Sequence, residues 1–287
     1  MFKNRYIIIF WFVSLTLLLS CSRRDLIELT TFNSCSIVKV NINDVTNTKV
    51  NENKLYKVFI YQNDNLIRQK EALSIDTLML SEGIYDFIIF DESCENFQLF
   101  EMNHFSTATG ILKYKDVQNK ILSTPKQVKF FSINKLDIQN SKLNTIDINL
   151  DIIEKSVNYQ LMFEGAKESV DKCFVKQKGV AYGVKLSDNT PLYSEDKDIC
   201  HLFEVSASNK YTNQIELLGV HPVFKEIEIQ FEFIDSTVQK TKIDISKIDD
   251  SYMYSKKLII SADISYVNTS ITAFIKSWIL VKDTLKI

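Results

Sequence analysis

Long stretches of the chain alternate strictly between apolar and polar residues. In EIEIQFEF, residues 226–233, every second side chain is isoleucine or phenylalanine, and TIDINLDI, residues 145–152, repeats the pattern. A period of two turns one side of a strand toward a core and the other toward water. Both stretches are therefore predicted to be half-buried antiparallel strands, and we expect Phe231, Ile227 and Ile148 to point into cores. In the run at residues 84–90, Phe87 and Ile89 share one face of the expected strand, and we expect them to point into a core as well.

Further apolar runs follow one another along the chain, with turn residues between them. Such spacing predicts a β-sandwich fold. Only residues 165–179 could form a short helix. The runs predicted as additional strands are 35–42, 54–61, 74–80, 84–90, 127–133, 157–164, 180–186, 200–207, 214–219, 257–264 and 270–281.

A polar stretch without alternation, NKLDIQNSKLN at residues 134–144, separates two halves of the chain that are both rich in predicted strands. Domain boundaries fall in such segments. The sequence thus predicts two tandem antiparallel β-sandwich domains, over residues 35–140 and 141–287. One large all-β domain is the alternative.

The last run, SITAFIKSWILV at residues 270–281, is apolar on both faces of the expected strand. A strand of this kind must be covered twice, either inside its own sandwich or partly by a neighbouring chain. It is either the last central strand of the second domain or a subunit contact formed by strand pairing. Strict alternation would put Ile275 and Ile279 on one face. The candidate contact residues are Ile271, Phe274, Trp278 and Leu280.

The first 21 residues have the pattern of an export signal. Lys3 and Arg5 precede an apolar run of about fourteen residues, which is too short to span a bilayer. The run ends in Leu-Leu-Ser before Cys21, which resembles the lipobox of bacterial lipoproteins. That resemblance implies a signal peptide over 1–20 and a palmitate-type lipid on Cys21, followed by a tether over 21–34. With Ser22 and not aspartate after the cysteine, it further implies the outer membrane.

Composition fits an ordinary folded protein. The chain has 287 residues, 45% of them hydrophobic, with 6 Gly and 3 Pro, so it is neither low-complexity nor disordered. The formal net charge is -2, and loss of Lys3 and Arg5 with a signal peptide would make it -4. No basic stripe is present to bind nucleic acid.

Four cysteines follow Cys21: Cys35, Cys94, Cys173 and Cys200. Export permits disulfides, and four cysteines allow three pairings. Pairing Cys35 with Cys94 and Cys173 with Cys200 would keep each bridge within one half of the chain. Free buried thiols are the equally open alternative.

No recognisable catalytic pattern occurs. Neither GxSxG, GxxxxGK[ST], GxGxxG nor HExxH is found, and His104, His201 and His221 are far apart. The acidic stretch SEDKD, residues 194–198, lacks the glycine turn of a calcium loop and is interpreted as a solvated loop. We therefore expect a structural or binding protein and not an enzyme, with no metal, cofactor or small-molecule substrate.

Residues 55–93 carry a family resemblance. Leu80, Gly83 and Tyr85 form a Leu-x-x-Gly-x-Tyr turn, where Gly83 can adopt a positive φ, and the following strand ends in Phe90 and Asp91. This resembles the first domain of the fimbrial anchor and fimbrillin-like lipoproteins of Gram-negative anaerobes. The stretches YQLMFEG, GVAYGVKLS and LLGVHP are similar to the second domain of that family.

The resemblance implies two transthyretin-like β-sandwiches on the cell surface. It also implies fimbrial subunits as partners, a role in fimbria assembly and adhesion, and no enzyme activity. A surface glycan-binding lipoprotein of a polysaccharide-uptake system is the alternative. A glycan binder should expose a flat row of aromatic side chains, whereas an anchor should expose an apolar groove or a strand edge.

Overall fold

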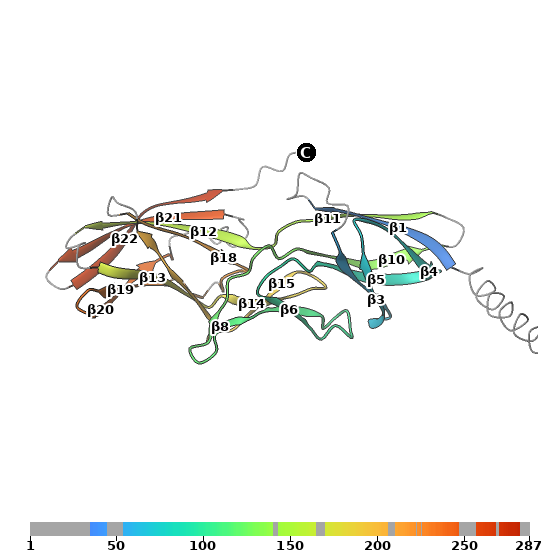
Figure 1. The fold of residues 1–287 in the computed structure, drawn as a ribbon, viewed down its shortest axis with the longest axis horizontal. Helices are drawn as coiled ribbons and strands as arrows, with labels where there is room; N and C mark the ends of the chain where they lie inside the picture. The colour runs from blue at the N-terminus through green and yellow to red at the C-terminus, as the bar shows by residue number, and fades with distance from the viewer. Residues whose placement is uncertain are drawn as a thin grey trace, which may run out of the picture.

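The computed structural model describes residues 35–44, 54–139, 143–164, 170–205, 210–221, 223–224, 226–246, 257–267 and 270–281. Every regular element within these ranges is a β-strand. Figure 1 shows an elongated molecule with one β-sandwich at each end and shorter strands between them. The predicted all-β fold of two β-sandwiches is confirmed.

The first sandwich packs a three-stranded sheet, in the order β11-β1-β4, against a four-stranded sheet, in the order β10-β5-β2-β3. Ile148 and Phe87 are buried between the two sheets, as their apolar spacing predicts. The strands are β1 (Cys35–Asp44), β2 (Tyr56–Gln62), β3 (Asn65–Ala72), β4 (Ile75–Ser81), β5 (Gly83–Asp91), β10 (Phe130–Ile138) and β11 (Asn144–Leu150).

The pairing of β11 changes the domain boundary that was expected near Asn140. This strand lies parallel to β1, with Ile146 opposite Val40 and Ile148 opposite Ile42. The polar segment before it is partly strand β10 and partly the connection from β10 to β11. The first sandwich therefore extends to Leu150.

The second sandwich packs a five-stranded sheet, in the order β17-β18-β12-β21-β22, against a six-stranded sheet, in the order β20-β19-β13-β16-β9-β8. Its strands are β12 (Lys155–Glu164), β13 (Val170–Lys178), β16 (Asp198–Leu202), β17 (Glu204–Val205), β18 (Lys210–Leu217), β19 (Glu226–Phe233), β20 (Val238–Asp244), β21 (Lys257–Val267) and β22 (Ser270–Val281).

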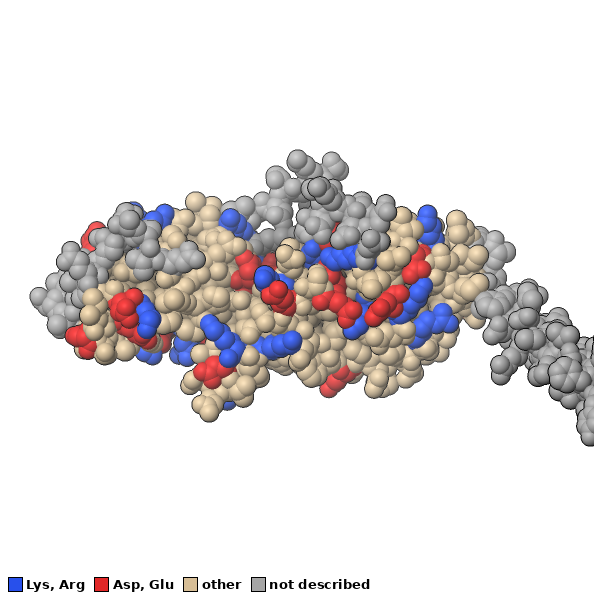
Figure 2. Space-filling model, in the orientation of Figure 1, with Lys and Arg blue, Asp and Glu red and all other residues tan. Residues whose placement is uncertain are grey.

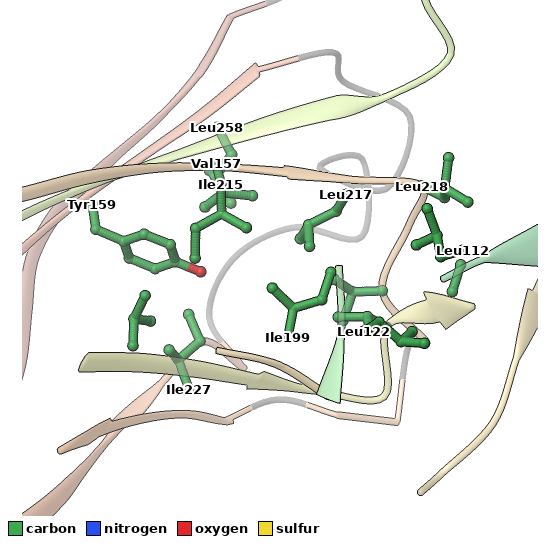
Figure 3. Packing of buried hydrophobic residues seen from close by; sticks show 14 of the residues in the cluster. Leu112, Leu122, Val157, Tyr159, Ile199, Ile215, Leu217, Leu218, Ile227 and Leu258 are labelled. Atoms are coloured by element: carbon green, nitrogen blue, oxygen red, sulfur yellow. The ribbon is translucent and has the colours of Figure 1, made fainter. Parts of the chain in front are cut away.

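Figure 3 shows the core of this sandwich. Val157, Tyr159 and Leu258 come from one sheet and point toward Ile199 and Ile227 from the other. The Tyr159 hydroxyl donates to Oε1 of the buried Gln177 at 3.3 Å. Gln177 belongs to β13, so the short helix expected over residues 165–179 is wrong for residues 170–178.

The two sandwiches share one strand topology. In the first, β1 lies between the antiparallel β4 and the parallel β11, and in the second, β12 lies between the antiparallel β18 and the parallel β21. The opposite sheets also correspond, because β10-β5-β2-β3 matches β20-β19-β13-β16. Within the described residues, β22 has no counterpart in the first sandwich.

A connection from the first half of the chain completes the second sandwich. It contains β6 (Phe97–Phe100), β7 (Thr109–Leu112), β8 (Tyr114–Asp116) and β9 (Ile121–Leu122). Strand β7 pairs with β14 (Ala181–Lys185), which in turn pairs with β15 (Thr190–Tyr193), while β9 pairs with β16. The chain therefore crosses between the sandwiches more than once.

The core of the second sandwich continues onto the first. Phe59, Tyr61, Ile88 and Phe90, on the outward side of the four-stranded sheet, belong to the same buried cluster as Phe231. Strands β2 and β5 are thus covered on both faces, which explains why their sequences are nearly continuous apolar runs.

Buried ion pairs join four strands at the edge of the first sandwich's core. Lys54 Nζ lies 2.6 Å from Asp91 Oδ2 and 3.1 Å from Asp44 Oδ2, and Lys129 Nζ lies 2.9 Å from Asp44 Oδ1. Burial alone would lower the pKa of Lys54, but the hydrogen bonds to Asp91 and Asp44 raise it. These contacts fix the ends of β1 and β5 and the residues before β2 and β10.

Candidate functional site

Strand β22, which contains the predicted contact residues, lies at the edge of the second sandwich. It pairs antiparallel with β21, from Ser270 opposite Val267 to Val281 opposite Lys257. No described strand pairs with its other side. The interpretation of this run as a central strand is therefore wrong.

A β-bulge in β22 changes which side chains share a face. Ser277 pairs with Ser261, but Ile275 pairs with Ala262, so Lys276 has no partner of its own. Because side chains alternate along a strand, one extra residue reverses the pattern beyond it. The expectation that Ile275 and Ile279 share one face is therefore wrong.

The bulge turns Trp278 to the inner side of the sheet. Trp278 lies opposite the buried Ile260, whereas Ile279 lies outside and is 57% exposed. Ala273 and Ile275 pack against the core and are partly buried. Ile271, Phe274 and Leu280 are placed by backbone register, and their side chains lie outside the described residues.

A groove of about 680 Å³, here called the edge groove, separates β22 from β20. These are the outermost strands of two facing sheets, so the groove is the open side of the sandwich. Its apolar lining is Ala273, Ile275 and Trp278. The polar lining consists of Lys242, Asp244, Lys276 and Ser277.

The lysines of the edge groove are paired with acids. Lys242 Nζ lies 2.6 Å from Glu226 Oε2, and this hydrogen bond raises the pKa of Lys242. Lys276 Nζ lies 3.4 Å from Asp263 Oδ2. An occupant of the groove therefore does not have to carry a charge.

Exposed aromatic side chains are dispersed over the described residues. Phe100 on β6, Tyr114 on β8 and Trp278 on β22 belong to three different sheets. The flat aromatic row expected of a polysaccharide-binding surface is not formed by these three. An open groove between strand edges, which is the kind of feature expected of an anchor, is present, and its lining is partly apolar.

Neither of the two candidate disulfide pairs is formed, because Cys94, Cys173 and Cys200 are free thiols, which was the alternative left open. Cys200 lies opposite Lys176, whereas Cys173 is three residues from Lys176 and points to the other face of the sheet. Cys173 is buried in the core, and burial raises its pKa. Cys94 packs against the same core, and burial raises its pKa to about 12.

The histidines lie in three separate environments. His104 Nδ1 lies 3.9 Å from Asp64 Oδ2. His201 is on β16, where burial lowers its pKa. The His221 ring contacts the Tyr193 ring. In the part of the chain that the structure describes, no group of three or more His, Cys, Asp or Glu could hold a metal ion. In the predicted acidic loop, Asp196 pairs with Lys120 at 2.7 Å and Asp198 with Lys176 at 2.9 Å.

Acidic and basic side chains are interspersed on the face shown in Figure 2. Cys21, the predicted signal peptide and the predicted tether lie outside the described residues. Over the described ranges, no helix is long and apolar enough to cross a membrane.

No protein-family model and no curated protein matches the sequence. Solved structures share the fold. A candidate adhesin from Bacteroides ovatus aligns with a TM-score of 0.62 at 16% identity over 75% of this chain and 84% of its own. The fimbrial anchor protein Mfa2 from Porphyromonas gingivalis aligns with a TM-score of 0.56 at 10% identity, over 86% of this chain and 99% of its own.

A candidate polysaccharide-binding protein from Bacteroides thetaiotaomicron aligns with a TM-score of 0.53 at 10% identity, over 86% of this chain and 99% of its own. The family resemblance found in the sequence is thus confirmed at the level of the fold.

Proposed function

We propose that this chain is a lipid-anchored cell-surface protein that anchors or joins the subunits of a fimbria. The observation that carries the proposal is the edge groove between β20 and β22. An added strand gains affinity from main-chain hydrogen bonds and specificity from alternate side-chain pockets. The partner is a fimbrial subunit that contributes an extended segment with small apolar side chains.

Two further observations support this role. The fold is shared with a protein named as a fimbrial anchor and with a candidate adhesin. Strand β22 is also an addition to a topology that the first sandwich completes without it. Contact and assembly require no catalytic residues, so the proposed role is structural and not enzymatic.

Lipid on Cys21 would hold the protein at the outer membrane. Each buried methylene contributes about 0.8 kcal/mol, and two or more acyl chains are needed for stable attachment. Mass spectrometry of the N-terminal peptide from isolated membranes tests this step. A Cys21→Ser variant should leave the membrane fraction, and an unmodified peptide spanning Ser20 and Cys21 as the main species would contradict lipidation.

A substitution inside the edge groove tests the contact. Trp278→Lys should reduce the number of anchored fimbriae on the producing cell by about tenfold or more, because a charge would enter the apolar lining. Its thermal midpoint should stay near that of the wild type, since Trp278 is 37% exposed.

Ile234→Lys is the matched control. Ile234 follows β19 in the turn to β20, is 70% exposed and does not line the edge groove. It should leave anchoring unchanged. If both variants fold and both anchor fimbriae normally, the groove is not the contact.

A further inference from the structure

The outer face of the five-stranded sheet has a depression lined mostly by uncharged polar side chains. It measures about 470 Å³ and lies over β18, β12 and β21. We call it the amide pocket. Its side-chain lining is Asn158 and Gln160 from β12, Thr212 and Gln214 from β18, and Lys257 and Ile259 from β21.

Strand register arranges these side chains in two rows. Gln214, Asn158 and Ile259 are direct neighbours across three strands, and Thr212 lies opposite Gln160 in the next row. Three amide side chains and one hydroxyl, all of which can donate and accept hydrogen bonds, therefore lie beside the aliphatic side chain of Ile259.

One polar group of the first row is buried without a partner: Asn158 Nδ2 forms no hydrogen bond. Ser156 Oγ, two residues away on the same face of β12 but outside the pocket lining, is also buried and forms no hydrogen bond. A buried polar group without a hydrogen bond costs about 1–3 kcal/mol. A solvent-facing sheet surface does not need such groups, because water satisfies exposed side chains.

We propose that the amide pocket binds a single sugar residue. Sugar hydroxyls donate and accept hydrogen bonds, as this lining requires, and the C–H face of a sugar ring can pack against Ile259. Lys257, the one charged side chain in the lining, can donate to a hydroxyl. Gln214 and Lys257 beside Asn158 are exposed, and Gln214 Nε2 donates to Glu216 Oε1 at 2.6 Å. A bound sugar would have to displace these two side chains for one of its oxygens to reach Asn158 Nδ2.

This site differs from an aromatic platform for a polysaccharide chain, because it recognises one ring by hydrogen bonds. The amide pocket and the edge groove have no lining residue in common. Sugar binding thus goes beyond the proposed role in fimbrial anchoring and would add an adhesive contact to the same domain.

Titration of the protein from Cys21 onward with single sugars tests the inference. The probes are glucose, galactose, mannose, fucose and N-acetylglucosamine, each up to about 10 mM, followed by saturation-transfer NMR and calorimetry. At least one should bind. The double variant Gln160→Ala/Thr212→Val should weaken that binding by about tenfold or more, since two hydrogen bonds are lost.

Thr145→Val is the matched control. Thr145 is exposed on β11 of the first sandwich, far from the amide pocket in the fold, and its replacement should leave sugar binding unchanged. Trp278→Lys should also bind sugar normally, so a failure of the fimbrial role is separable from a failure of this site.

The variant Asn158→Leu distinguishes a loss of sugar binding from a loss of stability. The leucine has a similar volume and leaves no partnerless donor, so this variant should lose sugar binding and unfold at an equal or higher temperature. The inference is overturned if none of the five sugars binds, if binding survives the double variant, or if Asn158→Leu lowers the unfolding midpoint.

Discussion

Phe231 shows how a single side chain holds the second sandwich together. It is fully buried on β19, and its ring centroid lies 5.2 Å from that of Phe163 and 6.2 Å from that of Tyr211. These rings come from both facing sheets. The alternation of apolar and polar residues around position 231 was enough to predict that Phe231 is buried, but not which aromatic rings it contacts.

Phe231→Asp should prevent stable folding of the second sandwich. Truncating a buried phenylalanine costs about 3–5 kcal/mol, and the aspartate adds an unpaired buried charge. Denaturant unfolding checks this against Ile234→Asp, which changes an exposed side chain nearby and should cost less than about 0.5 kcal/mol. Equal stability of the two variants would contradict the assignment of Phe231 to the core.

Glu154 should make stability depend on pH. It accepts a hydrogen bond from the Val128 N–H at 2.9 Å, while its Oε2 is buried without a partner. Burial raises the pKa of Glu154. A carboxyl whose pKa is raised on folding contributes stability below its unfolded pKa, and that contribution is lost as pH rises through the folded pKa.

Relative to the wild type, Glu154→Gln should gain about 1 kcal/mol of stability between about pH 4, where the wild-type carboxyl is protonated, and pH 7, because the amide accepts the hydrogen bond from Val128 without a charge. The amide NH2 that replaces the buried Oε2 has no acceptor there, and its cost does not depend on pH. Unfolding midpoints measured at both pH values check this. A difference that is independent of pH would exclude ionisation of Glu154 as the cause.

At the scale of elements, the turn between β4 and β5 depends on Gly83. Its φ is +152°, and an added Cβ would lie 3.0 Å from Gln62 Nε2. Residues other than glycine rarely adopt this backbone conformation. The Leu-x-x-Gly-x-Tyr turn found in the sequence therefore has a direct backbone cause, and Tyr85 adds a hydrogen bond from its hydroxyl to the Ser81 carbonyl at 3.1 Å.

Gly83→Ala should destabilise the first sandwich by about 1–3 kcal/mol through this strain. Ser81→Ala, at the exposed end of β4, keeps the main-chain acceptor of Tyr85 and serves as the control. Chemical denaturation of both variants gives the comparison. If Gly83→Ala matches the control, the positive φ carries no cost.

At the scale of the whole molecule, the two sandwiches are joined as one body. Residues of β2 and β5 complete the core of the second sandwich, and β9 from the first half pairs with β16 from the second. Separating the sandwiches would expose Tyr61 and Phe90. A protein joined in this way can transmit a pulling force without opening between its two sandwiches.

The protein from Cys21 onward should therefore unfold in a single transition. Trp278 is the one tryptophan left after residue 20, so its fluorescence reports on the second sandwich, whereas far-ultraviolet circular dichroism reports on both. The two unfolding curves should coincide. Two separated transitions would show that the sandwiches are independent.

Alternation in the sequence by itself determined the all-β class and the core positions Ile227, Phe231, Ile148, Phe87 and Ile89, because burial on one face leaves a period of two. The export signal was likewise predicted from local sequence alone, namely the basic residues Lys3 and Arg5 and the length of the apolar run after them. Strands with charged or short sequences, such as β3, β8, β13 and β20, were missed because their burial depends on distant partners.

Only the tertiary structure decided the features that depend on pairing. The parallel match of β11 with β1 moved the domain boundary, since pairing partners are set by the whole fold and not by local composition. The bulge at Lys276 turned Trp278 inward, and the faces of β13 and β16 separated Cys173 from Cys200. The edge groove and the amide pocket arise where strands distant in sequence meet, so no local pattern could have located them.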